Sequence, residues 1–364
     1  MRRRKRLAPN DLLKDRRILV TGGTGSLGRV LLSRILGGEV GLPSKIIVFS
    51  RDENKQHQIR LDYQNCAFPT DEVIYRNAAR LLEFRIGDVR DYSAVCGALR
   101  DVDIVFNAAA MKQVPTCEYS PSEAMMTNLN GAQNIVRAIR DLRLPVDVVV
   151  GVSTDKAAKP VNVMGMTKAL QERIFTSASL HAPDTRFIVV RYGNVLASRG
   201  SVVPLFHHQI RGGGPVTITH PKMTRFLLSL NDAVSTIFDA VSEARTAEIY
   251  VPRIPSARVL DVAQALIARR RIETKIVGIR PGEKLHEVLI SEEESHRAFQ
   301  RGEYYVISSI LPELKAPDSG EIFLGKEYSS NDLVMTRDEV ARLLIENDLM
   351  VDDAPVENEK ELVR

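Results

Sequence analysis

The feature that most constrains this chain of 364 residues is a glycine-rich turn at residues 20–28, Val-Thr-Gly-Gly-Thr-Gly-Ser-Leu-Gly. The turn directly follows a β-rich run at 17–21 and opens a helical pattern at 27–36. Its glycines let the backbone turn tightly and approach a pyrophosphate, and the following helix N-terminus supplies N–H donors. In this strand–turn–helix context the turn predicts a dinucleotide site. The cofactor contacts that we expect from it are Thr21, Gly22, Gly25, Ser26, Leu27 and Gly28.

Short β-rich runs alternate with helical patterns through the first half of the chain, as in successive βαβ units. The predicted strands are 17–21, 45–49, 83–86, 103–107, 146–152 and 186–191. Six such strands predict an α/β fold with a Rossmann-like, doubly wound parallel sheet. After residue 191 the chain becomes richer in loops, which predicts a smaller, less regular C-terminal lobe that binds the substrate. Further helices are expected at 124–142, 231–244 and 257–269.

Composition excludes several classes of protein. Aromatic residues are 5% of the chain, Trp is absent and the net charge is only +4, which argues against a nucleic-acid-binding surface. The basic run at residues 2–6 is expected to be a solvated terminus. No apolar stretch approaches the roughly 20 residues that span a bilayer. Cys66, Cys96 and Cys117 form no CxxC pair and the histidines lack metal-ligand spacing, so we expect no disulfide, no metal and a cytoplasmic location.

The loop after the second predicted strand bears on the choice between NAD and NADP. NAD-binding proteins usually place an acid here for the ribose 2′-hydroxyl, whereas an Arg meets the 2′-phosphate of NADP. Ser50 and Arg51 come first and favour NADP, with Lys55 as a second charge, whereas Asp52 keeps NAD open.

Two later strand ends extend the predicted cofactor site. Asp88, followed by Val89, is placed to accept a hydrogen bond from the adenine amino group. The small residues Ala108, Ala109 and Ala110 would let the chain run close to the cofactor. Asn128 is expected to tie the backbone at the sheet rather than to take part in chemistry.

The expected proton carrier of many nicotinamide enzymes is missing. Such enzymes often place a Tyr four residues before a Lys, but Met164 precedes Lys168 here, and a thioether cannot carry a proton. The nearest alternatives are Asp155 and Lys156, which follow Thr154 one short loop upstream. Either this pair replaces the Tyr or the chain does no catalysis.

Taken together, these segments resemble the extended short-chain dehydrogenase/reductases, and within them the bacterial UDP-N-acetylglucosamine 4,6-dehydratases. The narrower resemblance covers roughly residues 15–345. It rests on the following stretches: Phe49-Ser50-Arg51-Asp52-Glu53, Ala108-Ala109-Ala110-Met111-Lys112-Gln113-Val114-Pro115, Ser153-Thr154-Asp155-Lys156-Ala157, Arg191-Tyr192-Gly193-Asn194-Val195, Ser198-Arg199-Gly200-Ser201, Met223-Thr224-Arg225-Phe226 and Gly282-Glu283-Lys284. Some members of that family keep the Tyr and others have Met. This chain is similar to the Met type, which includes capsule enzymes that also invert C5.

The resemblance implies NADP-dependent loss of water from a UDP-N-acetylhexosamine, for surface polysaccharide or glycan synthesis. Lys156 would be the base, with its pKa lowered by burial and by neighbouring positive charge. Asp155 would be the acid for the departing 6-hydroxyl, or would orient Lys156. Thr154 would bond the 4-hydroxyl, and Lys168 would hold the nicotinamide ribose.

The same resemblance implies the substrate contacts and the assembly. Lys112 is expected beside both cofactor and sugar, and Met164 is expected to pack on them. The UDP contacts implied are Asn194, Arg199, Arg225 and Glu283. Relatives form dimers or hexamers, so a homo-oligomer is expected.

The predicted organisation has four parts: a basic disordered tail at 1–15, the NADP-binding domain at 16–192 with 228–262 packing back on it, a nucleotide-sugar lobe at 193–227 and 263–350, and a mobile acidic tail at 351–364.

Other functions stay open. A 4-epimerase, or a dehydratase for a GDP- or TDP-linked sugar, would use the same fold. A non-catalytic NADP-binding sensor or scaffold is the alternative of another class.

Overall fold

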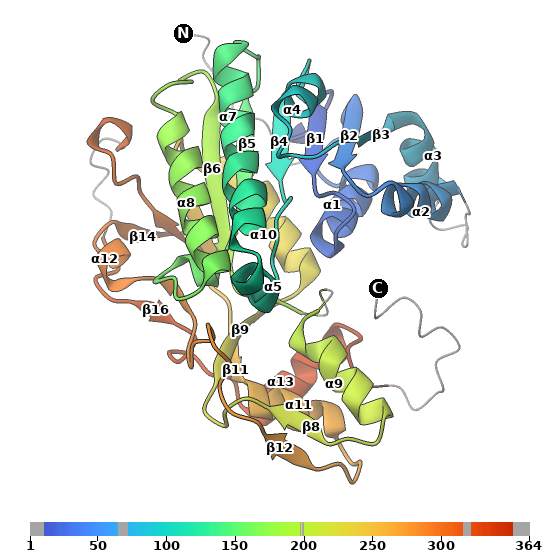
Figure 1. Ribbon diagram of the computed structural model, residues 1–364, viewed down its shortest axis with the longest axis vertical. Helices are drawn as coiled ribbons and strands as arrows, with labels where there is room; N and C mark the ends of the chain where they lie inside the picture. The colour runs from blue at the N-terminus through green and yellow to red at the C-terminus, as the bar shows by residue number, and fades with distance from the viewer. Residues whose placement is uncertain (1–10, 65–71, 197, 199, 316–321, 352–364) are drawn as a thin grey trace.

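The computed structural model describes residues 11–64, 72–196, 198, 200–315 and 322–351. Its largest element is a nine-stranded sheet in the order β14-β15-β10-β6-β5-β4-β1-β2-β3 (Figure 1). The strands are β1 (Arg17–Thr21), β2 (Lys45–Ser50), β3 (Leu82–Ile86), β4 (Ile104–Asn107), β5 (Val148–Thr154), β6 (Arg186–Tyr192), β10 (Ile249–Pro252), β14 (Ala298–Arg301) and β15 (Tyr304–Ile307). The seven strands from β3 to β10 in this order pair in parallel, and β15 runs antiparallel to both of its neighbours, β10 and β14. The predicted α/β fold and its six strands are confirmed.

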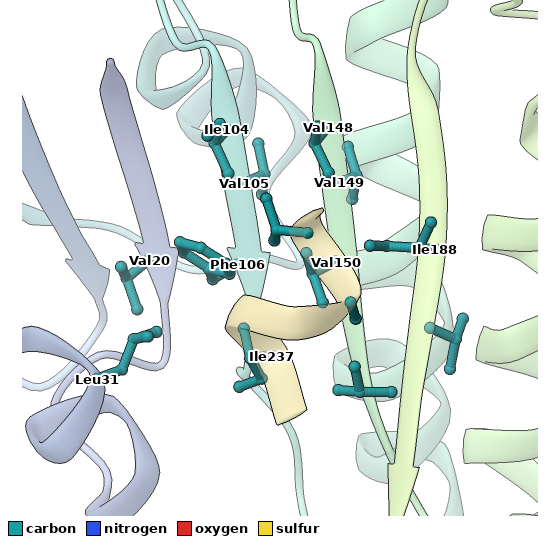
Figure 2. Packing of buried hydrophobic residues seen from close by; sticks show 14 of the residues in the cluster. Val20, Leu31, Ile104, Val105, Phe106, Val148, Val149, Val150, Ile188 and Ile237 are labelled. Carbon is teal, nitrogen blue, oxygen red and sulfur yellow. The ribbon is translucent and has the colours of Figure 1, made fainter. Parts of the chain in front are cut away.

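Helices cover both faces of the sheet, as a doubly wound fold requires. On one face α1 (Ser26–Leu36) packs against α3 (Glu72–Leu81) and α10 (Leu230–Glu243). On the other face α7 (Gly131–Asp141) lies between α4 (Tyr92–Ala98) and α8 (Val163–Ala178). Apolar side chains fill the space between these layers: Val20, Leu31, Phe106, Val150 and Ile237 are among those shown in Figure 2.

A second, smaller core lies below the carboxyl ends of the parallel strands (Figure 1). It is formed by three helices, a three-stranded sheet of order β11-β9-β7 and the parallel pair β8–β12. Their bounds are α9 (Val202–Arg211), α11 (Val259–Ile267), α13 (Arg337–Glu346), β7 (Asn194–Val195), β8 (Val216–Ile218), β9 (Thr224–Leu228), β11 (Ser256–Arg258) and β12 (Thr274–Ile276). The remaining elements are α2 (Glu53–Gln64), α5 (Val114–Tyr119), α6 (Pro121–Ala124), η3 (Met125–Asn130), η4 (Asp155–Ala157), α12 (Glu292–Ser295), η5 (Pro312–Leu314) and the pair β13 (Val288–Ile290) and β16 (Tyr328–Ser329).

Four parts of the predicted organisation differ from the structure. Residues 256–262, placed on the NADP-binding domain, form β11 and the start of α11, whose apolar side chains pack in the second core. The helix expected at 124–142 is divided, because the π-helical turn η3 precedes α7. The β14–β15 hairpin, placed in the sugar lobe, instead pairs with β10. Leu12 and Leu13, placed in a disordered tail, are buried in the main core because they are apolar and Leu13 donates its N–H to the Val40 carbonyl. Most of the predicted basic run and acidic tail lies outside the described residues.

Two glycines give a test of the predicted close packing at the glycine-rich turn. A Cβ on Gly28 would lie 2.5 Å from the Gly23 Cα, whereas a Cβ on Gly97 in α4 would meet nothing within 4 Å. Gly28→Ala should therefore destabilise the protein by about 1–3 kcal/mol, since backbone must shift to admit the methyl group. Gly97→Ala, the control, should be neutral or slightly stabilising, because Ala favours helix over Gly. Equal midpoints of denaturant unfolding for the two variants would contradict the tight fit of this turn.

Candidate active site

A cleft of about 760 Å³ runs along the carboxyl ends of the parallel strands. This is the usual ligand position in a doubly wound sheet. Almost all of the described residues predicted to bind cofactor or substrate line it, from Gly22 after β1 to Glu283 in the loop before β13. Thr21 and Asp155 do not line the cleft. Arg199 lies outside the described residues.

The glycine-rich turn at one end of the cleft has the shape of a phosphate cradle. Gly22 has a φ of +66°, and a Cβ there would lie 2.7 Å from the Ala109 nitrogen, so only Gly fits. The N-cap of α1 is Gly25, which has no side chain with which to cap the helix end. Such a helix end favours an anion, and a dinucleotide pyrophosphate fits its first-turn N–H groups. Thr21 is a structural tie instead, because its buried hydroxyl donates to Asn107 Oδ1 at 2.7 Å.

The loop after β2 carries the charges predicted to choose the cofactor. Asp52 is engaged by Lys55, whose Nζ lies 2.7 Å from Asp52 Oδ2. Hydrogen bonds from Lys55 hold the pKa of the Asp52 carboxyl below its usual value. The Arg51 side chain is 61% exposed, lies 3.8 Å from the Asp88 carboxylate and also lowers the pKa of Asp52. The Asp52 carboxylate is therefore paired with Lys55 within the loop, whereas the Arg51 guanidinium is accessible to an anion.

Asp88, which is predicted to contact adenine, hydrogen-bonds within the protein to Arg90. Its two carboxyl oxygens accept hydrogen bonds from Arg90, one from the backbone N–H at 3.0 Å and one from Nε at 2.9 Å. Although burial alone would raise the pKa of Asp88, the bonds from Arg90 lower it below its usual value.

Lys156 lies between two carboxylates at the end of β5. Its Nζ donates to Asp155 Oδ1 at 2.9 Å and lies 3.6 Å from Glu287 Oε1. Burial, the largest influence, lowers the pKa of Lys156, but Asp155 and Glu287 outweigh it and the pKa is raised above its usual value. The expectation of a lowered pKa is therefore wrong, because it did not include the second carboxylate, which lies 131 residues further along the chain.

Asp155 is completely buried and does not reach the cleft. Its Oδ1 accepts from the Thr154 hydroxyl at 2.9 Å as well as from Lys156. This geometry fits the role of orienting Lys156, and it does not fit direct protonation of a substrate. The N-cap of the short η4 turn is Thr154, not Asp155, since Thr154 Oγ1 accepts from the Lys156 N–H at 3.4 Å.

Lys168 and Met164 both line the cleft from α8, one helical turn apart. The Lys168 ammonium donates to the Val152 carbonyl at 2.5 Å and to Gln171 Oε1 at 2.6 Å. Burial lowers the pKa of Lys168 to about 8, against a smaller opposing effect of Glu172. Met164 is 4% exposed and packs with Cys117 and Met111.

The predicted substrate residues divide into two groups. Asn194, Lys112 and Glu283 line the cleft, and Asn194 Oδ1 is buried with no hydrogen-bond partner, so it could serve a bound ligand. Arg225 also lines it, but its guanidinium donates to the Thr224 and Lys284 carbonyls at 2.7 and 3.0 Å. Arg225 therefore holds the protein backbone rather than presenting a free fork to a diphosphate.

Sequence reasoning missed Glu287 and Tyr192, which also line the cleft. Glu287 is 2% exposed and follows the quoted Gly282-Glu283-Lys284 stretch by three residues, but no local pattern marks it as buried beside Lys156. The Tyr192 hydroxyl is buried without a hydrogen-bond partner, and burial raises its pKa. Asn128, in contrast, makes the predicted backbone tie, with bonds to both the N–H and the carbonyl of Met111.

The described parts of the chain contain no cluster of three or more His, Cys, Asp or Glu side chains that could hold a metal ion. They also contain no helix that is both long and apolar enough to cross a membrane.

Comparison with known proteins identifies the family. Residues 18–309 match the family described as polysaccharide biosynthesis protein. The chain is 41% identical to the inverting UDP-N-acetylglucosamine 4,6-dehydratase of Campylobacter jejuni, over 86% of this chain and 87% of that protein. It is 40% identical to a protein named UDP-glucose 4-epimerase in Rickettsia bellii, over 93% of this chain and 98% of that protein.

Solved structures agree on the fold. Pen from Bacillus thuringiensis superposes with a TM-score of 0.82 at 32% identity, over 93% of this chain and 99% of Pen. The dTDP-glucose 4,6-dehydratase DesIV from Streptomyces venezuelae, solved with NAD, shares the fold with a TM-score of 0.62 at 21% identity, over 74% of this chain and 86% of that one. The protein therefore belongs to the polysaccharide biosynthesis family of extended short-chain dehydrogenase/reductases, together with the UDP-N-acetylglucosamine 4,6-dehydratases.

Proposed function

We propose that the protein is an NADP-dependent dehydratase that converts UDP-N-acetylglucosamine to the 4-keto-6-deoxy sugar with inversion of C5, for surface polysaccharide or glycan synthesis. The observation that carries this proposal is the lysine between two carboxylates, Lys156 with Asp155 and Glu287, at the cleft wall. Dehydration moves protons at three sugar positions, and a coupled lysine–carboxylate cluster provides carriers for them. The similarity to the inverting Campylobacter enzyme supports the choice of substrate and stereochemistry.

The residues of the cleft have distinct tasks in this mechanism. A bound nicotinamide dinucleotide would supply reversible hydride acceptance and so oxidise the sugar at C4 for part of the cycle. The resulting 4-ketone acidifies the C5 hydrogen, and Lys156 in its amine form would take that proton. Thr154 and Asp155 hold Lys156 in place, and Lys168 contributes positive charge beside the reacting centre at pH values below about 8.

The charge arrangement after β2 supports NADP as the cofactor. The 2′-phosphate of NADP requires an accessible cation, and Arg51 is one, whereas Asp52 is neutralised by Lys55 and is poorly placed to select a ribose hydroxyl.

A 4-epimerase is the second candidate, because relatives at 40% identity over most of the chain carry that name. Epimerisation at C4 also requires oxidation of the sugar but no proton exchange at C5 and no loss of oxygen from C6. An epimerase would need Lys156 only for the 4-hydroxyl proton and would leave the second carboxylate, Glu287, without a proton to carry, which favours dehydration.

We also propose a cytoplasmic homo-oligomer, a dimer or a hexamer. The support for assembly is an apolar surface on α5, η3 and α8, which pack together. Tyr119, Met125, Met166 and Leu170 on these elements are 91%, 50%, 49% and 52% exposed. Exposed apolar patches of this kind commonly mark interfaces.

The proposed reaction is tested by incubating the protein with NADP and UDP-N-acetylglucosamine and following the sugar by proton NMR. We expect a C6 methyl doublet and a 4-keto product, because C6 loses its oxygen. Formation of UDP-N-acetylgalactosamine alone would favour the epimerase and contradict the proposal.

Lys156→Met should abolish product formation while leaving NADP binding unchanged, and near-normal turnover by this variant would remove Lys156 from the mechanism.

Cofactor choice is tested with Arg51→Asp. Replacing the cation with an acid should weaken NADP binding by at least about tenfold and NAD binding much less, since a charge-assisted bond to phosphate contributes about 1.5–3 kcal/mol. Fluorescence titration of both cofactors measures the ratio. Lys14→Asp, on the surface away from the cleft, controls for the change in net charge. Equal losses for the two cofactors would argue against NADP.

Assembly is tested by light scattering of the wild type and of Leu170→Glu. A charge in the centre of the apolar surface should shift the mass toward that of the 40.6 kDa monomer. A wild-type protein that is already monomeric at micromolar concentration would contradict the oligomer.

A further inference from the structure

Glu287 is a buried carboxylate at the cleft wall, directly before β13. Its side chain is 2% exposed and faces three cations: Lys156 Nζ at 3.6 Å, Arg225 Nε at 3.7 Å and Lys284 Nζ at 3.9 Å. Its Oε2 has no hydrogen-bond partner although it is buried. A buried carboxylate without full hydrogen bonding is costly, so its presence here calls for a functional reason.

The backbone around Glu287 is firmly held, so the position of the carboxylate is defined. Its N–H donates to Ser330 Oγ at 2.9 Å, and its carbonyl accepts from the Ser330 N–H at 2.8 Å. Two residues later, the Leu289 carbonyl accepts from the buried Arg191 at 2.9 Å. The β13 segment is thereby fixed to the sheet that carries Lys156.

Asp155 and Glu287 relate to Lys156 in different ways. Asp155 makes the shorter contact, but it is sealed from the cleft. Glu287 lines the cleft on the same wall as Lys156. Of the two carboxylates, Glu287 is therefore the one able to exchange a proton both with Lys156 and with the cleft.

We propose that Glu287 is a positioning residue that holds the Lys156 ammonium at the cleft wall and accepts a proton from it during turnover. Transfer of one proton from Lys156 Nζ to the Glu287 carboxylate turns an ammonium and a carboxylate into an amine and a carboxylic acid. The net charge of the pair stays zero, and the amine gains a lone pair. The catalytic part of this inference rests on the dehydration proposed above, in which that amine takes the C5 proton.

Lys156 must lose a proton before it can act in the proposed reaction. A lysine whose pKa is raised is protonated near neutral pH and cannot act as a base until it loses a proton. The charged groups that face Lys156 are Asp155, Glu287 and Arg225, and Lys284 faces Glu287 from the same loop. Arg225 cannot accept a proton, and Asp155, although its Oδ2 is unpartnered among the described residues, is sealed from the cleft. Glu287 is the carboxylate that faces both Lys156 and the cleft.

The test measures the titration of Lys156 without any substrate. Lysines of the full-length protein are labelled competitively with acetic anhydride across a pH series, and the extent of labelling at Lys156 is read by mass spectrometry. Glu287→Gln should lower the midpoint for Lys156 by about one pH unit or more, because an opposite charge is lost. Lys284→Met should not lower the midpoint and should move it upward, because a like charge is lost. Glu292→Gln, an exposed acid in α12, should leave it unchanged.

Opposite shifts from Glu287→Gln and Lys284→Met support the coupling, since a general loosening of the site would move both variants the same way. An unchanged Lys156 midpoint in Glu287→Gln, or equal shifts in both variants, would overturn the coupling.

The second readout is turnover: Glu287→Gln should reduce kcat at least tenfold with little change in KM, and Glu287→Asp should restore part of the loss. A normal kcat in Glu287→Gln would overturn the proton-accepting role. If the wild type is inactive but the two variants shift the Lys156 labelling midpoint in opposite directions, the proposed dehydration is refuted and the coupling between Glu287 and Lys156 is supported.

Discussion

The arrangement of the site depends on one buried arginine, Arg191, at the end of β6. Its guanidinium pairs with Glu172 of α8 and Glu294 of α12, and it also donates to the Leu289 carbonyl. Removing one member of such a buried network would leave an uncompensated charge in the interior, at a cost of about 3–5 kcal/mol. Through these contacts a segment far along the chain is held against the parallel sheet, and Glu287 is brought to Lys156.

The two lysines of the cleft show how the surroundings decide protonation. Lys156 and Lys168 are both largely buried, and burial alone disfavours their charged forms. Two close carboxylates reverse that effect for Lys156, whereas the weaker influence of Glu172 leaves the pKa of Lys168 at about 8. A site without the usual tyrosine can in this way hold two different lysines. Lys156 stays protonated, whereas Lys168 loses its proton close to physiological pH.

Local sequence was enough to predict six of the nine strands of the main sheet and the glycine-rich turn, because strand periodicity and the Gly22–Gly28 spacing are encoded within short windows. The positions of Met164, Lys168 and Asn194 along the cleft follow from the same local logic, since strand ends and the first two turns of the helix that follows β5 lie near the carboxyl edge. Glu287, the backbone-bound Arg225 and the raised pKa of Lys156 could not be predicted. Each depends on contacts between residues more than fifty positions apart, which no local pattern records.

The central claim is that the cleft removes and returns a proton at C5 of the sugar. Conversion of UDP-N-acetylglucosamine in D₂O, followed by proton NMR and mass spectrometry of the product, tests it most directly. The account predicts a 6-deoxy-4-keto product that carries one solvent deuterium at C5, because the returning proton comes from side chains that exchange with solvent. A product without solvent deuterium at C5, or a C4 epimer that retains its 6-hydroxyl, would contradict it.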